Sequence, residues 1–235
     1  MLAVRAGAQT PALAVADSLF TVGETAKAIE MLEGSNPATI SIILKLAQYN
    51  AAKGNIKEAV GYYEKVLHQN PEKILATIEY AKALVKDNQL MKADSVYREL
   101  NKKYPENANF YYQRGLIKEQ EQENDEEALP FYKLTIEKDQ SHQPALYKLA
   151  KNELQNRSYD MAKNYSLMGL EHHPENVSLL SILAQAYSAR ALYKKAIPPF
   201  EKLVELGEKS EFIFTRLGYA YLHEGNLEDA ITAYT

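Results

Sequence analysis

The 235-residue chain contains no cysteine, and this absence removes several kinds of chemistry at once. Without thiols it can form no disulfide, no zinc–thiolate site and no cysteine nucleophile. It also lacks any run of about 18 apolar residues, the length that a membrane-spanning helix requires. We therefore expect no disulfide framework and no membrane span.

Positive charge is neither abundant nor clustered. Lysine and arginine number 27 against 31 aspartates and glutamates, which gives a net charge of −4. Proteins that bind nucleic acid need grouped lysines and arginines to neutralise phosphates. The charge distribution therefore predicts no nucleic-acid partner.

Catalytic and metal-binding motifs are also missing. There is no His-Glu-x-x-His, no glycine-rich phosphate loop and no nucleophile motif. His172 and His173 are adjacent, so on a helix they diverge and make a poor metal pair. The acidic run from Glu119 to Glu127 lacks the alternating ligands and the glycine of a calcium loop, and is typical of a solvated, helix-capping turn. We expect no catalytic residue, no metal site and no cofactor, and hence not an enzyme.

What the chain does have is a repeat. One ladder of seven alanines recurs at intervals of 31 to 35 residues: Ala28, Ala59, Ala93, Ala128, Ala162, Ala196 and Ala230. A second ladder of small residues precedes it by twelve or thirteen positions: Ala16, Ala47, Ala81, Gly115, Ala150, Ala184 and Gly218. Two such ladders in register predict a stack of helical hairpins, because each small residue lies where two helices come closest.

The local patterns agree with stacked hairpins. Apolar residues recur every three or four positions, as in Leu180, Leu183 and Tyr187, which marks one face of a helix. Between the two helical stretches lie residues that tolerate a left-handed cap: Gly23, Gly54, Asn88 and Gly225. Three prolines separate successive repeats: Pro71, Pro105 and Pro174. No strand-like alternation is present, so the sequence predicts an all-α protein.

The repeat resembles that of the tetratricopeptide-repeat (TPR) family. The residues that carry the resemblance are clearest in the last repeat: Phe214, Leu217-Gly218, Tyr221, Gly225-Asn226, Ala230 and Tyr234. The resemblance implies a right-handed α-solenoid of about seven TPR helix-turn-helix repeats. Their expected ranges are 9–39, 40–73, 74–107, 108–142, 143–176, 177–210 and 211–235. The last repeat is short by the family pattern, so we expect the native chain to continue past Thr235.

Residues 1–8 stand outside the repeats. Ala6-Gly7-Ala8 before Gln9 is a small-x-small pattern like a signal-peptidase site, which favours a signal-peptide remnant and export to the periplasm or outside the cell. The full apolar region of a signal peptide is missing from these residues. The alternative is a disordered Ala-rich N-terminus on a cytoplasmic protein, and both interpretations stay open.

Six of the seventeen tyrosines fall at packing positions of the repeat. Tyr63, Tyr97, Tyr132 and Tyr234 occupy the aromatic position of the second helix, four residues after the ladder alanine. Tyr187 and Tyr221 occupy the tyrosine position of the first helix. Aromatic residues at helical spacing usually pack helix against helix. We therefore look elsewhere for a binding surface.

The resemblance implies that the first helix of each repeat lines a groove that holds a peptide or a partner segment. Counting by family position, the candidate partner-binding residues are Gln48, Lys82, Tyr112, Leu116, Tyr147, Lys151, Gln185 and Tyr219. Among them Tyr112, Tyr147 and Lys151 form the richest aromatic and charged set. The carboxylate-clamp pattern of chaperone-binding TPR proteins does not appear at matching positions, so that role is disfavoured.

Two functions remain open at this point. The first is a non-catalytic scaffold that binds a protein or peptide in the groove. The second is a regulatory or assembly domain of a larger protein whose effector or catalytic part lies beyond residue 235. The sequence identifies neither the partner nor the oligomeric state.

Two prolines stand at equivalent places in the second helices of their repeats. Pro130 and Pro198 each follow a ladder alanine by two residues. We expect both helices to persist through the proline with a bend, because the first N–H groups of a helix lack partners anyway. The alternative is that each helix begins at the proline.

Overall fold

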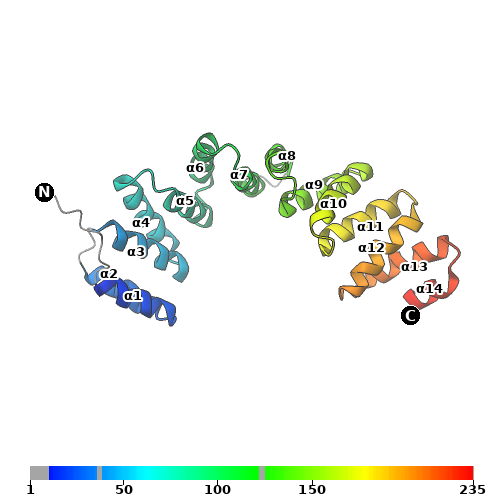
Figure 1. Cartoon of the computed structure of the whole chain (residues 1–235), viewed down its shortest axis with the longest axis horizontal. Helices are drawn as coiled ribbons and strands as arrows, with labels where there is room; N and C mark the ends of the chain where they lie inside the picture. The colour runs from blue at the N-terminus through cyan, green and yellow to red at the C-terminus, as the bar shows by residue number, and fades with distance from the viewer. Residues whose placement is uncertain (1–10, 36–38, 122–124, 235) are drawn as a thin grey trace. The chain divides into compact units, whose positions relative to one another are not determined.

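The structure is a computed structural model, and it describes residues 11–35, 39–121 and 125–234. These residues form fourteen α-helices, one short 3₁₀ helix and no strand (Figure 1). The first helices of the pairs are α1 Pro11–Thr21, α3 Ile40–Lys53, α5 Ile74–Lys86, α7 Ala108–Glu121, α9 Gln143–Gln155, α11 Val177–Ala189 and α13 Glu211–His223. The second helices are α2 Thr25–Gly34, α4 Ile56–Gln69, α6 Leu90–Lys103, α8 Leu129–Lys138, α10 Tyr159–His172, α12 Tyr193–Glu205 and α14 Leu227–Tyr234, with the 3₁₀ helix η1 Asp125–Glu127 before α8. The prediction of an all-α solenoid is confirmed.

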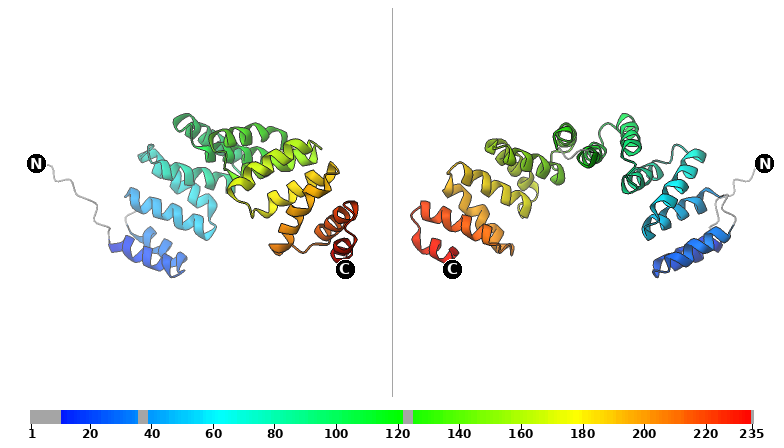
Figure 2. Two further views of the ribbon diagram at one scale, coloured as in Figure 1. Left: turned by 45° about the vertical axis from the view of Figure 1, so that its right-hand side comes forward. Right: turned by 180° about the vertical axis from the view of Figure 1, so that it is seen from behind.

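The chain divides into two compact units, one ending at Leu100 and the other beginning at Asn101. In the first unit, α1 to α4 each pack against the helix that follows. In the second unit, α7 to α14 form the same kind of series, and α9 also contacts α11 directly. Figure 2 shows these successive hairpins from two further directions. The contact between α9 and α11 brings two first helices side by side, which matters for the site.

The two ladders of small residues lie at helix contacts, as predicted. Every alanine of both ladders is at most 3% exposed, and the two ladder glycines are buried. Gly115 on α7 shows why small residues are needed there, since a β-carbon at this position would lie 2.5 Å from Cε1 of Tyr132 on α8. The prediction of helical hairpins in register with the alanines is confirmed.

The turn residues adopt the left-handed conformation that their types predicted. The backbone φ angle is +85° at Gly23, +92° at Gly54, +59° at Asn88 and +79° at Gly225. Arg157 and Ala191 adopt it too, with φ of +60° and +56°. Both stand at the equivalent turn of their own repeats, so the repeat geometry overrides their residue types.

The two prolines behave differently from each other. Helix α12 begins at Tyr193 and continues through Pro198 and Pro199, so the prediction that it persists is confirmed. Helix α8 begins only at Leu129, which places Pro130 in its first turn, and the prediction of an earlier start was wrong. The 3₁₀ helix η1 precedes it, and a proline near the first helical position is favourable because its missing N–H would have no partner there.

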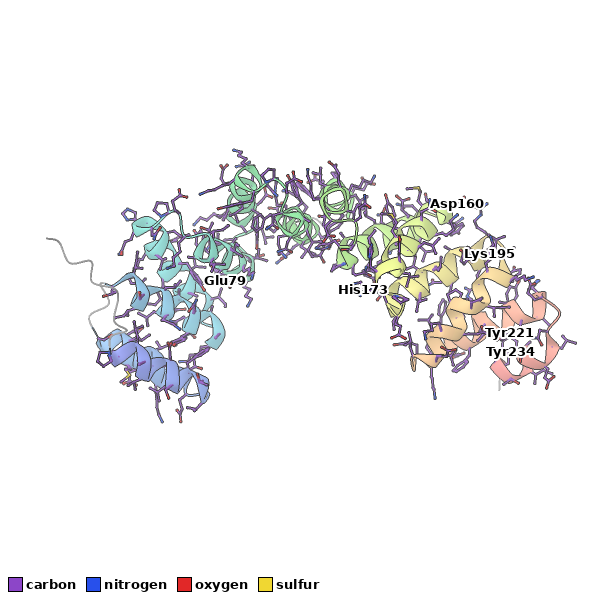
Figure 3. The ribbon with its side chains drawn as sticks, viewed as in Figure 1. Glu79, Asp160, His173, Lys195, Tyr221 and Tyr234 are labelled. Carbon is purple, nitrogen blue, oxygen red and sulfur yellow. The ribbon has the colours of Figure 1, made fainter. Side chains whose placement is uncertain are left out.

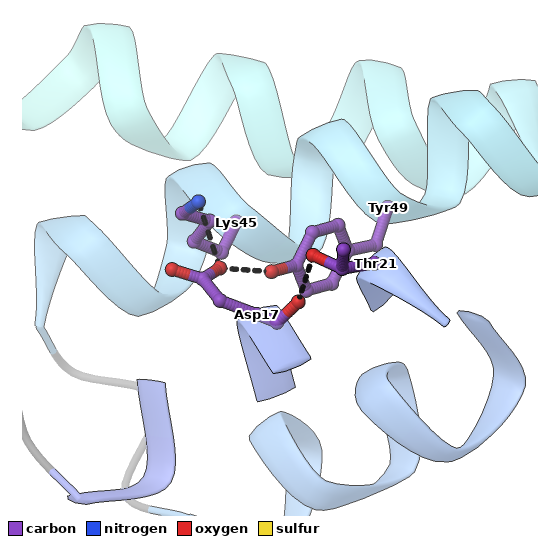
Figure 4. Close-up of polar contacts among 4 residues, drawn as sticks. All are labelled: Asp17, Thr21, Lys45 and Tyr49. Carbon is purple, nitrogen blue, oxygen red and sulfur yellow. Dashed lines mark hydrogen bonds and ion pairs between the residues drawn. The ribbon is translucent and has the colours of Figure 1, made fainter. Parts of the chain in front are cut away.

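A polar cluster joins the first two repeats of the first unit (Figure 4). Asp17 on α1 forms an ion pair with Lys45 on α3, with 2.8 Å between Oδ1 and Nζ. Tyr49, also on α3, donates its hydroxyl to the same carboxylate. Burial raises the pKa of Asp17, but the hydrogen bonds from Lys45 and Tyr49 outweigh it, so that pKa lies below its usual value.

Two further expectations concern a membrane span and export. No helix among the described residues is long and apolar enough to cross a membrane. The Ala6-Gly7-Ala8 triplet lies outside the described residues, so the prediction of export stays a prediction.

Candidate functional site

Three adjoining hollows lie on the first helices of the second unit. The first, of about 480 Å³, lies between α9 and α11 and is lined by Tyr147, Lys151, Leu154, Gln155, Val177, Ser178, Ser181, Ile182 and Gln185. The second, of about 250 Å³, is lined by Leu154, Tyr159, Gln185, Ser188, Ala189, Phe212 and Arg216. The third, of about 600 Å³, is lined by Ser188, Tyr193, Glu211, Phe212, Thr215, Arg216 and Tyr219.

The hollows share walls and therefore form one surface. Leu154 and Gln185 border both the first and the second hollow. Ser188, Phe212 and Arg216 border both the second and the third. We call this surface, defined by the lining residues above, the α9–α13 groove. Its floor comes from three consecutive first helices, which is where the repeat pattern placed a binding surface.

The repeat period explains why these residues share one surface. Lys151, Gln185 and Tyr219 are successively 34 residues apart, so they occupy one position on α9, α11 and α13. Tyr147, Ser181 and Thr215 have the same relationship. Equivalent positions of stacked repeats face the same way, so a row of them forms a continuous strip.

Aromatic side chains of the groove are accessible to a ligand. Phe212 is 44% exposed and Tyr219 is 43% exposed. Tyr219 contacts Tyr193 and His223, with ring centroids 5.6 Å and 4.4 Å away, and the hydrogen bond between Tyr193 and Tyr219 raises the pKa of Tyr193. Large, half-exposed aromatics held by neighbouring rings are the residue type that most often anchors a protein partner.

The groove also holds cations without a carboxylate partner. Among the described residues, neither Lys151 nor Arg216 has an acidic oxygen within 4 Å, whereas Lys148 on α9 pairs with Glu119 at 2.5 Å. The guanidinium of Arg216 lies 5.5 Å from the ring centre of Phe212. The unpaired cations are therefore free to meet a ligand.

The other predicted groove residues lie elsewhere. Tyr112 and Leu116 are partly buried on α7 and line none of the three hollows. The ring of Tyr112 packs 5.6 Å from Tyr132 and 4.7 Å from His142, and burial raises its pKa. Tyr112 thus lies outside the hollow that Tyr147 and Lys151 line, although Tyr112 and Tyr147 pack against the same buried cluster.

The two candidates nearest the N-terminus belong to the first unit. Gln48 is exposed on α3. Lys82 is exposed on α5, and its Nζ forms an ion pair with Glu79 at 2.8 Å. None of the three hollows reaches either residue.

Sequence reasoning missed three residues that line the groove. Phe212 lies in the first turn of α13, Arg216 lies in the middle of α13, and Tyr193 is the first residue of α12. The period could have found all three. Phe212 stands 34 residues after Ser178, Arg216 stands 34 after Ile182 and Tyr193 stands 34 after Tyr159. The three earlier residues also line the groove.

The tyrosines assigned to packing do pack. Tyr63, Tyr97 and Tyr132 are each 1% exposed, and burial raises the pKa of Tyr63 to about 12. Figure 3 labels two more, Tyr221 and Tyr234, near the C-terminal end of the second unit. The Tyr221 hydroxyl donates to Glu201 at 2.6 Å, and the Tyr234 ring lies against Gly218.

Within the described ranges, no three histidines, aspartates or glutamates gather in a way that could hold a metal ion. The groove itself contains one carboxylate, Glu211, and no histidine. Its arrangement supplies apolar contact, hydrogen bonds and positive charge.

Comparison with known proteins gives a consistent result. The profile of the tetratricopeptide repeat matches residues 50–115. No protein of curated function matches the chain by sequence. The C-terminal part of a TPR repeat-containing protein from Cytophaga hutchinsonii has a similar structure, with a TM-score of 0.73 and 20% identity over 94% of this chain and 93% of that one.

Two further solved structures share the fold. A tetratricopeptide repeat protein from Parabacteroides merdae has a TM-score of 0.62 and 20% identity over 94% of this chain and 89% of that one. YrrB, described as a TPR protein with an unusual peptide-binding site, has a TM-score of 0.52 and 16% identity over 89% of this chain and 96% of that one. The profile match shows tetratricopeptide repeats in residues 50–115, and the paired helices and the similar solved structures show that the described residues have the fold of tetratricopeptide-repeat proteins.

Proposed function

We propose that this TPR protein is a non-catalytic scaffold that binds an extended segment of a partner protein in the α9–α13 groove. The observation that carries the proposal is the continuity of the three hollows, which share Leu154, Gln185, Ser188, Phe212 and Arg216. An extended chain advances by about 3.3 Å per residue, so a long, open groove suits a peptide better than a small molecule.

The composition of the groove supports a peptide ligand. Half-exposed rings such as Tyr219 and Phe212 offer large apolar contact, and the side chains of Gln185 and Ser181 offer donors and acceptors to a peptide backbone. Gln185 donates to Ser181 at 3.1 Å and can exchange that bond for one with a ligand. The TPR fold is a protein-interaction scaffold, and YrrB, a structural neighbour, is described as having a peptide-binding site.

The test uses a phage library of random dodecapeptides panned on the complete chain. Ser181→Trp with Thr215→Trp fills the first and third hollows from the floor of the groove. The matched control is Asn164→Trp with Lys195→Trp, at exposed positions of α10 and α12 that line no hollow. Circular dichroism checks that both variants are folded.

We expect peptides enriched on the wild type to bind the control variant and to lose binding to the filled groove. Truncating an anchor such as Tyr219 to alanine should cost about 2 kcal/mol of binding free energy. Peptides that bind the filled groove as well as the wild type, but lose binding to the control, would place the site on the second helices and refute the proposal.

A further inference from the structure

The charge of the α9–α13 groove differs from that of the whole protein. The chain carries a net charge of −4, yet the first two hollows are lined by Lys151 and Arg216 and by no carboxylate. Glu211 enters only at the third hollow. The groove is therefore locally positive on an acidic molecule.

Several other cations of the second unit are neutralised by nearby carboxylates. Lys118 pairs with Glu121 at 2.5 Å, and Lys138 pairs with Glu106 at 3.1 Å. Lys202 lies between Glu175 and Glu205 at 3.4 Å and 3.2 Å. Among the described residues, Lys151 and Arg216 have no such partner, so a ligand carboxylate would not have to displace one.

Arg216 is also held in position. Its guanidinium lies 5.5 Å from the ring centre of Phe212, one helical turn earlier on α13. A guanidinium held against an aromatic ring keeps its planar fork of donors available, and that fork matches both oxygens of a carboxylate. Lys151 contributes a more mobile point charge at the other hollow.

The wall between the two cations offers both apolar and polar contacts. Leu154 and Gln185 border both hollows, Lys151 lines the first and Arg216 lines the second. Phe212 adds a half-exposed ring beside Arg216. A ligand that fills this surface would place an apolar side chain on Leu154 and Phe212, with negative charge on either side.

We infer that the groove selects an acidic segment, in which two aspartate or glutamate side chains flank an apolar or aromatic residue and meet Lys151 and Arg216. This inference rests on the proposed function and adds the chemistry of the partner. A single-stranded nucleic acid also combines negative charge with flat rings. A phosphate backbone carries a charge at every nucleotide and needs clustered cations along its path. Two cations on a chain of net charge −4 therefore favour the peptide.

The test measures fluorescence anisotropy with three labelled dodecapeptide pools and the complete chain. All pools carry leucine or phenylalanine at the centre and glycine, serine or alanine elsewhere, and they differ only in having glutamate, glutamine or lysine on either side of the centre. The variants are Lys151→Gln, Arg216→Gln and the double charge reversal Lys151→Glu with Arg216→Glu. Lys195→Gln removes an exposed cation outside the groove, and Glu211→Gln removes the groove carboxylate.

We expect the glutamate pool to bind more tightly than the glutamine pool, with an advantage that falls as salt is raised. Lys151→Gln and Arg216→Gln should each weaken binding of the glutamate pool by about twofold to fivefold, the range for exposed charge pairs. Lys195→Gln should have no effect, and Glu211→Gln should leave the binding equal or tighter. The double reversal should transfer the preference to the lysine pool.

Equal binding of the glutamate and glutamine pools would overturn this inference and leave peptide binding in the groove intact. Failure of all three pools, together with no enrichment from the phage library, would overturn both proposals. Tighter binding of a twelve-nucleotide oligothymidylate, lost in Lys151→Gln and Arg216→Gln, would show that the cations serve a nucleic acid instead.

Discussion

The ring of Tyr132 on α8 packs directly against Gly115 on α7, and a β-carbon on that glycine would lie 2.5 Å from Cε1 of the ring. Gly218 and Tyr234 repeat the relationship in the last hairpin, with 2.8 Å between such a carbon and Cζ. In both hairpins the second-helix aromatic thus occupies the space that a side chain on the first helix would fill. The contact explains why glycine stands at these two rungs of the ladder.

We predict that Gly115→Ala destabilises the protein, although alanine is the better helix former. Tyr132 is 1% exposed, so its ring has little room to move away from a new methyl group. Overpacking of this kind costs about 1–3 kcal/mol, and the gain in helix propensity recovers only about 1 kcal/mol. Urea unfolding monitored by circular dichroism measures the difference.

Gly61→Ala is the matched control for that substitution. Gly61 lies inside α4, and a β-carbon there would meet nothing within 4 Å. We expect Gly61→Ala to stabilise the protein by about 0.5–1 kcal/mol. If both substitutions stabilise to the same extent, the contact between Gly115 and Tyr132 has no energetic importance.

The cluster around Asp17 predicts a dependence of stability on acidity. Burial raises the pKa of Asp17, but the hydrogen bonds from Lys45 and Tyr49 more than offset this rise. The pKa is therefore lowered, and the folded state favours the ionised carboxyl. A lowered pKa contributes stability above the unfolded-state value of about 4, and this contribution is lost as the pH falls through the folded-state value. Asp17→Asn should therefore cost about 1 kcal/mol at pH 7 and progressively less as the pH falls below the unfolded-state value of about 4.

Glu24→Gln controls for the loss of an ordinary surface charge. Glu24 pairs with Lys27 at 3.0 Å, and both side chains are well exposed. Exposed pairs contribute at most about 1 kcal/mol and often nothing measurable, so we expect a change within about 0.5 kcal/mol. An Asp17→Asn variant whose stability follows that of Glu24→Gln at every pH would refute the role of the cluster.

The sequence predicted the repeat and the helix contacts well, because small residues at close contacts leave a clear mark in residue type. It predicted the turns only where the residue type agreed with the backbone. Gly54 and Asn88 revealed a left-handed turn, whereas Arg157 and Ala191 adopt the same conformation with no such mark. The groove was predicted in the same partial way. The repeat position of Lys151 and Gln185 indicated that they line it. The unpaired state of Lys151 and the contact of Arg216 with Phe212 depend on side-chain positions, which the sequence does not give.

The left-handed alanine gives a third prediction. Ala191 has φ of +56°, a conformation that costs an L-residue roughly 1–2 kcal/mol and glycine almost nothing. Ala191→Gly should stabilise the protein by about 0.5–1 kcal/mol after the greater freedom of glycine in the unfolded chain is subtracted. Thermal unfolding followed by circular dichroism measures this difference. Ala189→Gly, at the last residue of α11, lies outside the left-handed turn and should not stabilise the protein.

The last prediction concerns the two prolines inside α12. Pro198 and Pro199 lack the N–H groups that would bond to the carbonyls of Lys194 and Lys195, and both lysines are exposed, so water can reach those carbonyls. Pro198 is itself exposed, whereas Pro199 is buried in the core. Pro198→Ala restores one helical hydrogen bond without loss of packing. It should stabilise the protein by about 1 kcal/mol, less than the roughly 3 kcal/mol of a buried helix interior, because water can already bond to the exposed carbonyl.

Pro199→Ala restores the neighbouring bond but leaves a space beside Phe200 and Leu203, which are fully buried in the same helix. The lost contact offsets the new bond, so we expect little net change in the free energy of unfolding. Denaturant titration of both variants separates the two effects. Equal stabilisation by the two substitutions would mean that Pro199 contributes no packing, and destabilisation by Pro198→Ala would mean that the proline supports the geometry of α12 rather than weakening it.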